Sequence, residues 1–224
     1  GGGVTSFGPR RCPSGTVGVG IGGHADASLD GAALRCTLPR LPLRTRLLLE
    51  PIADTFIASA SPTISFGTDT ELWVWRQSPA DTVPGSYVLT KWDLSSIPPG
   101  ESISWAEMRM TAFDGFAYGG DGNVYAHRIA DNAVWDESTT WETAPAALAD
   151  PLGHWWIWLA GPAIRVGRLN GLGLRDAVRA ERARSLPLGL RQHSQGYDTL
   201  YYSREYADPG QRPVLEIFHR PVGG

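Results

Sequence analysis

The sequence is short of lysine and of long hydrophobic runs, and each shortage excludes a class of protein. Lys91 is the only lysine among the 20 basic residues, and 23 acidic residues bring the formal net charge to −3. A chain without a basic excess has little electrostatic attraction for phosphate backbones, so we expect no nucleic-acid partner. No stretch of about 18 consecutive apolar residues occurs, so we expect no membrane span.

Methionine is also scarce, and the first one along the chain is Met108. The segment that begins at Gly1 does not resemble a signal peptide. Both observations fit an exported protein whose signal has been removed, and they equally fit a fragment of a longer protein.

Glycine, proline and tryptophan are plentiful. The chain has 27 glycines and 17 prolines among 224 residues, a share well above the roughly 12% of average proteins. This composition predicts many turns between short elements and argues against a helical bundle. Hydrophobic residues make up 42%, which is enough for a core. The nine tryptophans must lie in that core, on a partner surface or on a sugar-stacking face.

Both cysteines lie near the N-terminus, on either side of a predicted β-hairpin. Apolar residues alternate over 17–21, turn-forming residues follow, and apolar residues return over 33–38. A Cys12–Cys36 disulfide would close this hairpin and stabilise it by about 3–4 kcal/mol in the chain-entropy model. The alternative is two reduced, buried cysteines in a cytosolic protein. We favour the disulfide, since no zinc or redox spacing such as CxxC is present.

This N-terminal segment also resembles a known repeat. Its GG…CPSGTVGVGIGG…LDGAALRC pattern is similar to a glycine-rich, jacalin-like repeat of secreted bacterial proteins. We predict a disulfide-stapled hairpin over 1–38 and a linker leading into a first strand over 39–50. The main domain is predicted over 51–224.

In the main domain the pattern is β throughout. Turn signals separate short runs of β-branched and aromatic residues, and one helix is predicted over 174–182. The class is all-β, a jelly-roll-type antiparallel β-sandwich with one short helix. Strands are predicted over 53–58, 71–76, 87–94, 103–111, 124–130, 155–159, 187–191, 199–204 and 213–218.

Six ordered blocks of this domain carry a family resemblance. They read ADTFIA, LTKWDLSSIPPGE, AEMRM, AVWDESTTWETAP, LRDAV and SREYADPGQRPVLEIF. The domain resembles the DNRLRE-type domain, also described as a disaggregatase-related carbohydrate-binding module. It departs from that family at Trp92, where phenylalanine is usual, and in a tryptophan-rich insertion over 153–169. The resemblance implies a jelly roll, an extracellular location and recognition of polysaccharide, often an acidic one such as alginate.

The family blocks also contain residues for which we expect structural roles. Trp135 and Trp141 stand at hallmark positions and are expected in the core or at a corner, and Trp92 is expected in the core. Arg204 and Glu205 of the SRE block are expected to bond to backbone or to an opposite charge, or Arg204 to bind an acidic sugar. Because neighbours in a strand point to opposite faces, we do not expect these two to pair with each other.

No enzyme motif is present. The sequence has no GxSxG, no HExxH and no phosphate-binding loop ending in GK, and its five histidines are dispersed. We therefore expect a non-catalytic protein without an organic cofactor.

A structural calcium ion is the one cofactor for which the sequence offers ligands. The loop FDGFAYGGDGN contains Asp114, Asp121 and Asn123, whose oxygens suit calcium. The alternative is an ordinary hairpin loop built on Asp-Gly turns.

Strand alternation divides the remaining tryptophans into inward and outward sets. With Leu72 and Val74 inward, Trp73 and Trp75 point outward. Outward aromatic rings can stack on sugars, while flanking charges bond to hydroxyls. Two alternatives stay open: an interface between subunits, and packing under the 153–169 insertion. The candidate carbohydrate-binding residues are Trp73, Trp75, Trp105, Glu107 and Arg109.

Two functions follow from these patterns. The first is a non-catalytic extracellular module that binds polysaccharide. The alternative is a structural subunit of an extracellular fibre, sheath or coat, whose copies assemble through the N-terminal hairpin and the exposed aromatic residues.

Overall fold

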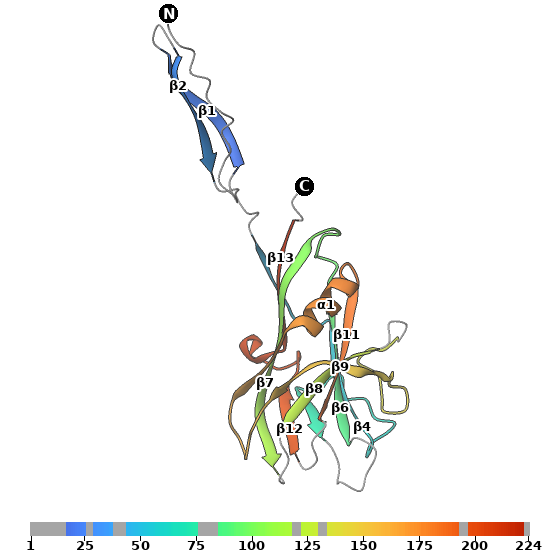
Figure 1. Cartoon of the computed structure of the whole chain (residues 1–224). Coiled ribbons are helices and arrows are strands. Elements are labelled where there is room, and N and C mark those ends of the chain that lie inside the picture. Colours follow the sequence, from blue (N-terminus) through green and yellow to red (C-terminus); the bar gives the residue numbers. More distant parts are fainter. Residues whose placement is uncertain are drawn as a thin grey trace, which may run out of the picture. The chain divides into compact units, whose positions relative to one another are not determined.

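The computed structural model describes residues 17–25, 29–37, 44–75, 85–117, 122–129, 134–192 and 197–221, the first two ranges as backbone only. It divides into two compact units, Gly1–Leu43 and Arg44–Gly224, shown in Figure 1.

The first unit contains one antiparallel hairpin. Strand β1 (Val17–Ala25) pairs with β2 (Leu29–Thr37), and Gly18 lies opposite Cys36. Cys12 lies outside the described residues, so the disulfide and the jacalin-like resemblance stay predictions.

The second unit is an all-β sandwich built from a strongly curled antiparallel sheet. One run of neighbouring strands has the order β4-β6-β11-β8-β9, and the other has the order β3-β13-β7 with β10 on the far edge of β7. Strands β12 and β5 continue from the second half of β7. The strands are β3 (Thr45–Leu49), β4 (Ala53–Ala58), β5 (Glu71–Trp75), β6 (Ser86–Asp93), β7 (Ser102–Ala117), β8 (Asn123–Ile129), β9 (Ala147–Trp156), β10 (Arg165–Asn170), β11 (Ser185–Gln192), β12 (Tyr197–Tyr202) and β13 (Val214–Arg220).

Strand β7 connects the two halves of the second unit. Its first half pairs with β13, and its second half pairs with β12 after a register shift near Phe113. Figure 1 shows β7 running the length of this unit. A strand that bends in this way presents two different outward faces along its course.

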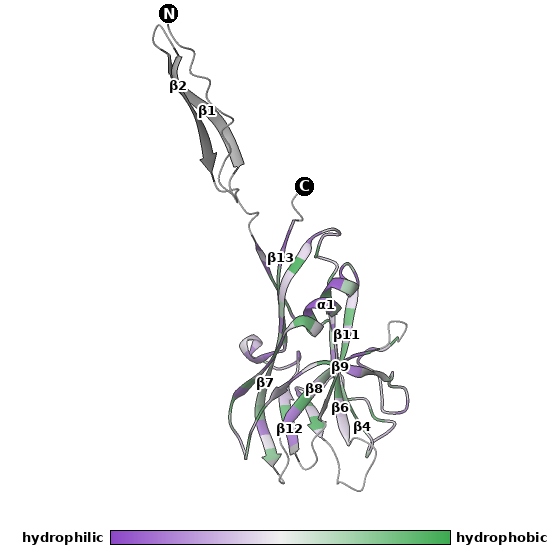
Figure 2. Ribbon diagram, in the orientation of Figure 1, coloured by the Kyte–Doolittle hydropathy of each residue, from purple (hydrophilic) through white to green (hydrophobic). Residues whose placement is uncertain are grey.

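The main core lies between the two runs of strands. Inward residues of β7, such as Met108 and Met110, pack in one cluster with inward residues of β6 and β11, including Trp92 and Leu188. The alternation of apolar and polar residues behind this arrangement is visible along β7 in Figure 2. The predicted core position of Trp92 is confirmed, since the side chain is fully buried.

A second, smaller core covers the other face of β4 and β6. Trp135 is buried there against Ile57 and Leu89, and Trp141 packs at its edge with its ring against Tyr87. The predicted core or corner roles of Trp135 and Trp141 are confirmed.

One helix, α1 (Leu172–Glu181), buries Leu174, Ala177 and Val178. It begins two residues before the predicted start. In the described part of the chain no helix has the length and apolar character needed to cross a membrane.

Several predicted strands have different ends, and one strand was missed. Strand β7 continues to Ala117 instead of ending at 111, and the predicted strand 155–159 is the end of β9 followed by an extended segment. Strand β10 was not predicted because RVGRLN carries two arginines and a glycine in six residues. Gly167 is needed there, since a Cβ at this position would lie 2.2 Å from the Trp155 indole nitrogen.

The expectation that Arg204 and Glu205 do not pair is wrong. Strand β12 ends at Tyr202, so both residues lie in a turn and not in a strand. Turn geometry lets neighbouring side chains approach each other, and Arg204 Nε lies 3.3 Å from Glu205 Oε1.

Candidate carbohydrate-binding face

Strand β5 presents an outward pair of tryptophans. Leu72 and Val74 are fully buried, so Trp73 and Trp75 point away from the core, as predicted. Their ring centroids lie 6.2 Å apart with planes inclined at 25°. Trp73 is 38% exposed. Trp75 is half-buried because Gly85 lies against its ring, where a Cβ would come within 2.4 Å.

A buried carboxylate lies beside this pair. Asp198 of β12 is paired with Trp75 on one side and with Phe116 of β7 on the other. Phe116 is 45% exposed, whereas Asp198 is only 7% exposed. The burial raises the pKa of Asp198 to about 6 because a low-dielectric environment disfavours the charged form.

One oxygen of this carboxylate, Asp198 Oδ1, is buried and has no hydrogen-bond partner among the described residues. A buried acceptor without a partner is costly, and a hydroxyl group from a ligand would satisfy it. An acceptor between two aromatic side chains can therefore fix a sugar ring that stacks on them.

The adjacent row of the same face is formed by Trp73, Leu200 and Asp114, which lie opposite one another on β5, β12 and β7. Asp114 Oδ1 accepts a hydrogen bond from the Gly115 amide at 2.8 Å. We call the surface formed by Trp73, Trp75, Asp198, Leu200, Asp114 and Phe116 the aromatic face.

The other three candidate residues lie elsewhere. Trp73 is aligned through Leu200 with Asp114, which is nine residues along β7 from Trp105. At about 3.3 Å per residue this separation is about 30 Å along the strand. The structure therefore does not bring Trp105, Glu107 and Arg109 together with the β5 tryptophans.

The charged groups around Trp105 are bonded within the protein. Glu107 is on the outward side of β7 but is itself buried, and it accepts hydrogen bonds from Arg168 at 2.6 Å and Asn170 at 3.2 Å. Arg109 Nη2 lies 3.5 Å from Glu216 Oε2. Trp105 contacts Phe218 edge to face at 5.5 Å. Through these contacts, Trp105, Glu107 and Arg109 belong to a structural network that joins β13, β7 and β10.

The predicted calcium ligands are not in one loop. Asp114 lies within β7, Asn123 begins β8, and Asp121 lies outside the described residues. Within the described ranges no group of three or more histidine, cysteine, aspartate and glutamate side chains could hold a metal ion. The calcium site stays a prediction.

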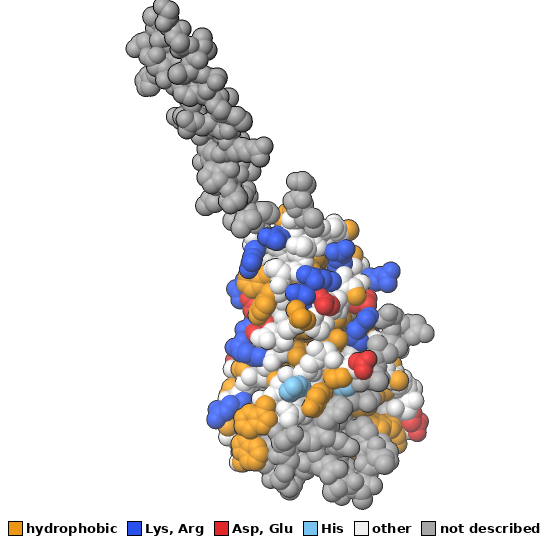
Figure 3. All heavy atoms as spheres, in the orientation of Figure 1, with side chains coloured by type: hydrophobic (Ala, Val, Ile, Leu, Met, Phe, Trp, Pro, Cys, Tyr) orange, Lys and Arg blue, Asp and Glu red, His pale blue; other side chains and the backbone are white. Residues whose placement is uncertain are grey.

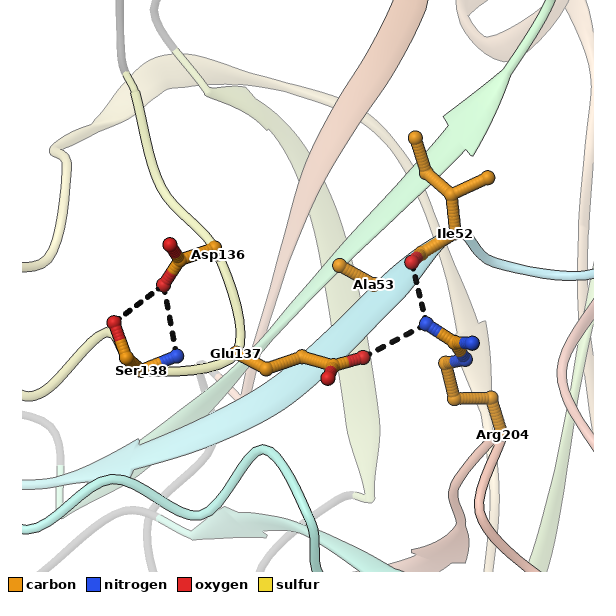
Figure 4. A pocket seen from close by; sticks show the side chains of 6 residues that line it. All are labelled: Ile52, Ala53, Asp136, Glu137, Ser138 and Arg204. Atoms are coloured by element: carbon orange, nitrogen blue, oxygen red, sulfur yellow. Dashed lines mark hydrogen bonds and ion pairs between the residues drawn. The ribbon is translucent and has the colours of Figure 1, made fainter.

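The family blocks ADT, WDESTTW and SRE meet at a second place, which we call the motif junction. The Arg204 guanidinium donates to the Ile52 carbonyl and, at 2.8 Å, to Glu137 Oε1. Figure 4 shows these contacts in an open pocket of about 400 Å³, lined also by Ala53, Asp136 and Ser138. Glu137 bonds to Arg204, and Asp136 bonds to Ser138. Because Arg204 also bonds to the Ile52 carbonyl, the junction connects three segments of the chain.

Asp54 lies behind this junction. Its Oδ2 accepts the Arg204 backbone N–H at 2.9 Å, and its side chain is almost fully buried. Burial, together with the charge and hydrogen bond of Glu205, raises the pKa of Asp54 to about 8. Asp54 is therefore largely protonated near neutral pH.

Asp198 and Phe116 were missed in the sequence because the predicted strands were too short. The strand predicted over 199–204 begins one residue after Asp198, and the one predicted over 103–111 ends before Phe116. Continued alternation through YDTLYY was the signal that would have included Asp198. The alternation of β7 is broken at Phe113, so the sequence gives no such signal for Phe116.

The fold is a curled β-sandwich that carries an aromatic face on its outer side, an arrangement suited to a binding module. A profile of carbohydrate-binding module family 96 matches residues 46–159, which is half of the chain, and the protein belongs to this family. The DNRLRE-type resemblance is consistent with that match. Trp73, Trp75 and Phe116 lie within the matched segment, and Asp198 lies beyond it. A search of curated proteins gave no match.

Proposed function

We propose that the protein is a non-catalytic, extracellular module that binds polysaccharide through the aromatic face. The observation that carries this proposal is the row Trp75, Asp198 and Phe116 across three neighbouring strands. Aromatic rings pack against the C–H faces of sugars, and a carboxylate between them accepts sugar hydroxyls. The membership of a carbohydrate-binding family supports the same assignment.

The non-catalytic part of the proposal is supported by the placement of one interacting acidic pair, Asp54 and Glu205. Asp54 and Glu205 interact directly, but Asp54 is buried and bonded to the Arg204 main chain. A glycosidase instead places two carboxyl groups on either side of the scissile bond.

The extracellular part rests on the type of ligand and on the predicted Cys12–Cys36 disulfide, since disulfides persist in oxidising compartments. The family match favours a glycan-binding module over the fibre, sheath or coat subunit.

Affinity electrophoresis in gels that contain alginate or hydroxyethyl cellulose tests this proposal against an acidic and a neutral polysaccharide. We expect retardation of the wild-type protein by at least one of them. Trp73→Ala should weaken binding by about 1–2 kcal/mol, the lower half of the range for ring stacking on bases. Its melting temperature should fall by less than that of a core variant such as Trp92→Ala, because Trp73 is partly exposed whereas Trp92 is fully buried.

Leu172→Ala is the matched control, since Leu172 is an exposed apolar residue on α1, outside the aromatic face. Retardation that Trp73→Ala and Asp198→Asn leave unchanged would show that the polysaccharide binds elsewhere.

A further inference from the structure

We propose that the glycan-binding surface continues past β7 onto Trp158 and Trp156, so that one extended polysaccharide chain contacts both tryptophan pairs. This inference rests on the proposed function and extends its site to a second aromatic pair, formed by the last residue of β9, Trp156, and by Trp158 just after it.

The backbone places this segment directly beside β7. The Gly161 N–H donates to the Gly115 carbonyl and the Ala163 N–H donates to the Phe113 carbonyl, both at 2.9 Å. These two bonds place residues 161–163 antiparallel to β7. Just before them, Leu159 lies against Gly115, where a Cβ would come within 3.0 Å of the Leu159 Cβ. Trp158 therefore lies near the part of β7 that carries Phe116.

Alternation along the segment determines which side chains face outward. Ile157 and Leu159 are buried in the main core, so Trp156 and Trp158 point away from it, as the exposed Phe116 does. They are 62% and 45% exposed. Their ring centroids lie 6.3 Å apart with planes inclined at only 17°, which resembles the arrangement of Trp73 and Trp75. Figure 3 shows exposed hydrophobic side chains gathered near the end of β7.

The segment is held firmly by its inward residues. The Trp155 indole N–H donates to the Tyr201 hydroxyl at 3.2 Å inside the core. Gly122, with φ of +66°, approaches the segment after β9 so closely that a Cβ there would lie 2.1 Å from the Ile157 carbonyl oxygen. Rings that are fixed before binding lose less conformational entropy when a ligand stacks on them.

The ligand of Trp156 and Trp158 is the same polysaccharide chain that binds the aromatic face, at sugar units further along it. From β5 through β12 and β7 to the segment beside β7 there are three strand spacings, about 14 Å at about 4.8 Å each. A chain that lies across the strands and continues in this direction meets Trp158 and then Trp156. Long chains should therefore bind more tightly than short ones, because short ones fill only the aromatic face.

The test compares polymers with their disaccharides. Binding of hydroxyethyl cellulose and alginate is measured by titration calorimetry, and binding of cellobiose and an alginate disaccharide by saturation-transfer NMR. Trp158→Ala should bind the retained polymer about fivefold to thirtyfold more weakly and its disaccharide as the wild type does. Trp73→Ala should weaken both. Val166→Ala, which removes an exposed apolar side chain of β10, should weaken neither.

Each failure has a distinct signature. If Trp158→Ala binds the polymer as tightly as the wild type while Trp73→Ala does not, the extension is wrong and the proposed function stands. If the wild type binds neither polymer, both are wrong. Sedimentation that shows a wild-type dimer and a Trp158→Ala monomer, with unchanged polymer affinity, would instead assign the pair to a subunit interface.

Discussion

The two buried aspartates Asp54 and Asp198 lie in different surroundings, one polar and the other aromatic. Asp54 lies at the motif junction, next to Glu205 and the Arg204 backbone, whereas Asp198 lies between Trp75 and Phe116 on the aromatic face. Burial raises the pKa of both groups, to about 8 and about 6 respectively. Asp54 is thus protonated in the neutral range and serves the fold, while Asp198 is ionised there and can accept hydrogen bonds from a ligand.

The raised pKa of Asp54 predicts a pH-dependent stability. The unfolded chain releases this proton near 3.8 and the folded chain near 8. The unfolded state therefore binds fewer protons between these values, and the free energy of unfolding falls as pH rises through this window. Asp54→Asn keeps a neutral group at every pH and should remove the decrease between about pH 6.5 and pH 8.5, where Asp198 is already ionised.

Urea denaturation of both proteins at these two pH values measures the effect. Asp176→Asn, at an exposed position of α1, is the matched control and should keep the wild-type slope. An Asp54→Asn protein that loses as much stability as the wild type over this interval would contradict the assigned titration.

At the scale of elements, strand β10 and the end of β9 support each other through one close contact. Gly167 of β10 lies against the Trp155 indole, and Trp155 fixes the segment that carries Trp156 and Trp158. The geometry of Trp156 and Trp158 therefore depends on residue 167 of β10 being a glycine, which has no side chain.

Gly167→Ala should consequently damage both stability and binding. The added methyl group meets a rigid, buried indole, and overpacking of this kind typically costs about 1–3 kcal/mol. We expect a lower melting temperature together with weaker retention by the polymer. Val166→Ala on the same strand changes an exposed side chain and should preserve both. A Gly167→Ala protein with wild-type melting would show that Trp155 can move aside.

The positions of the strands could be predicted from alternation, but several of their ends could not. The pattern ADTFIA gave β4 with its correct bounds, because turn residues follow it directly. Strand β7 was predicted too short because its alternation is broken at Phe113, where the structure has a register shift. Trp73 and Trp75 were therefore found in the sequence, whereas their partners Asp198 and Phe116 required the pairing of strands distant in sequence.

The separation of Trp105 from Trp73 has the same cause. Alternation shows which way a side chain points from its own strand, but it does not show where along a neighbouring strand that side chain lies. Both tryptophans point outward. Trp105 lies on the first half of β7, whereas Trp73 of β5 is aligned with the second half of β7. The ion pairs of Glu107 and Arg109 were equally inaccessible to sequence reasoning, since Arg168 and Glu216 come from remote segments.

At the scale of the whole second unit, we place the two tryptophan pairs and Phe116 on one surface, formed by β5, β12, β7, the end of β9 and the segment after it. The outer face of β4 and β6 is covered by the Trp135 and Trp141 segment, and the outward side of the β13, β7 and β10 group carries an ion-pair network. Within the described ranges, the aromatic face and its extension bring exposed large rings together with a carboxylate oxygen, Asp198 Oδ1, that has no hydrogen-bond partner.

The most direct test of polysaccharide binding at this surface uses the indole N–H signals of the tryptophans in a ¹⁵N-labelled protein. On addition of hydroxyethyl cellulose or alginate, we predict that the signals of Trp73, Trp75, Trp156 and Trp158 shift or broaden, while those of the buried Trp92 and Trp135 and of the distant Trp105 stay in place. Perturbation confined to Trp105, or no perturbation by either polymer, would contradict the account.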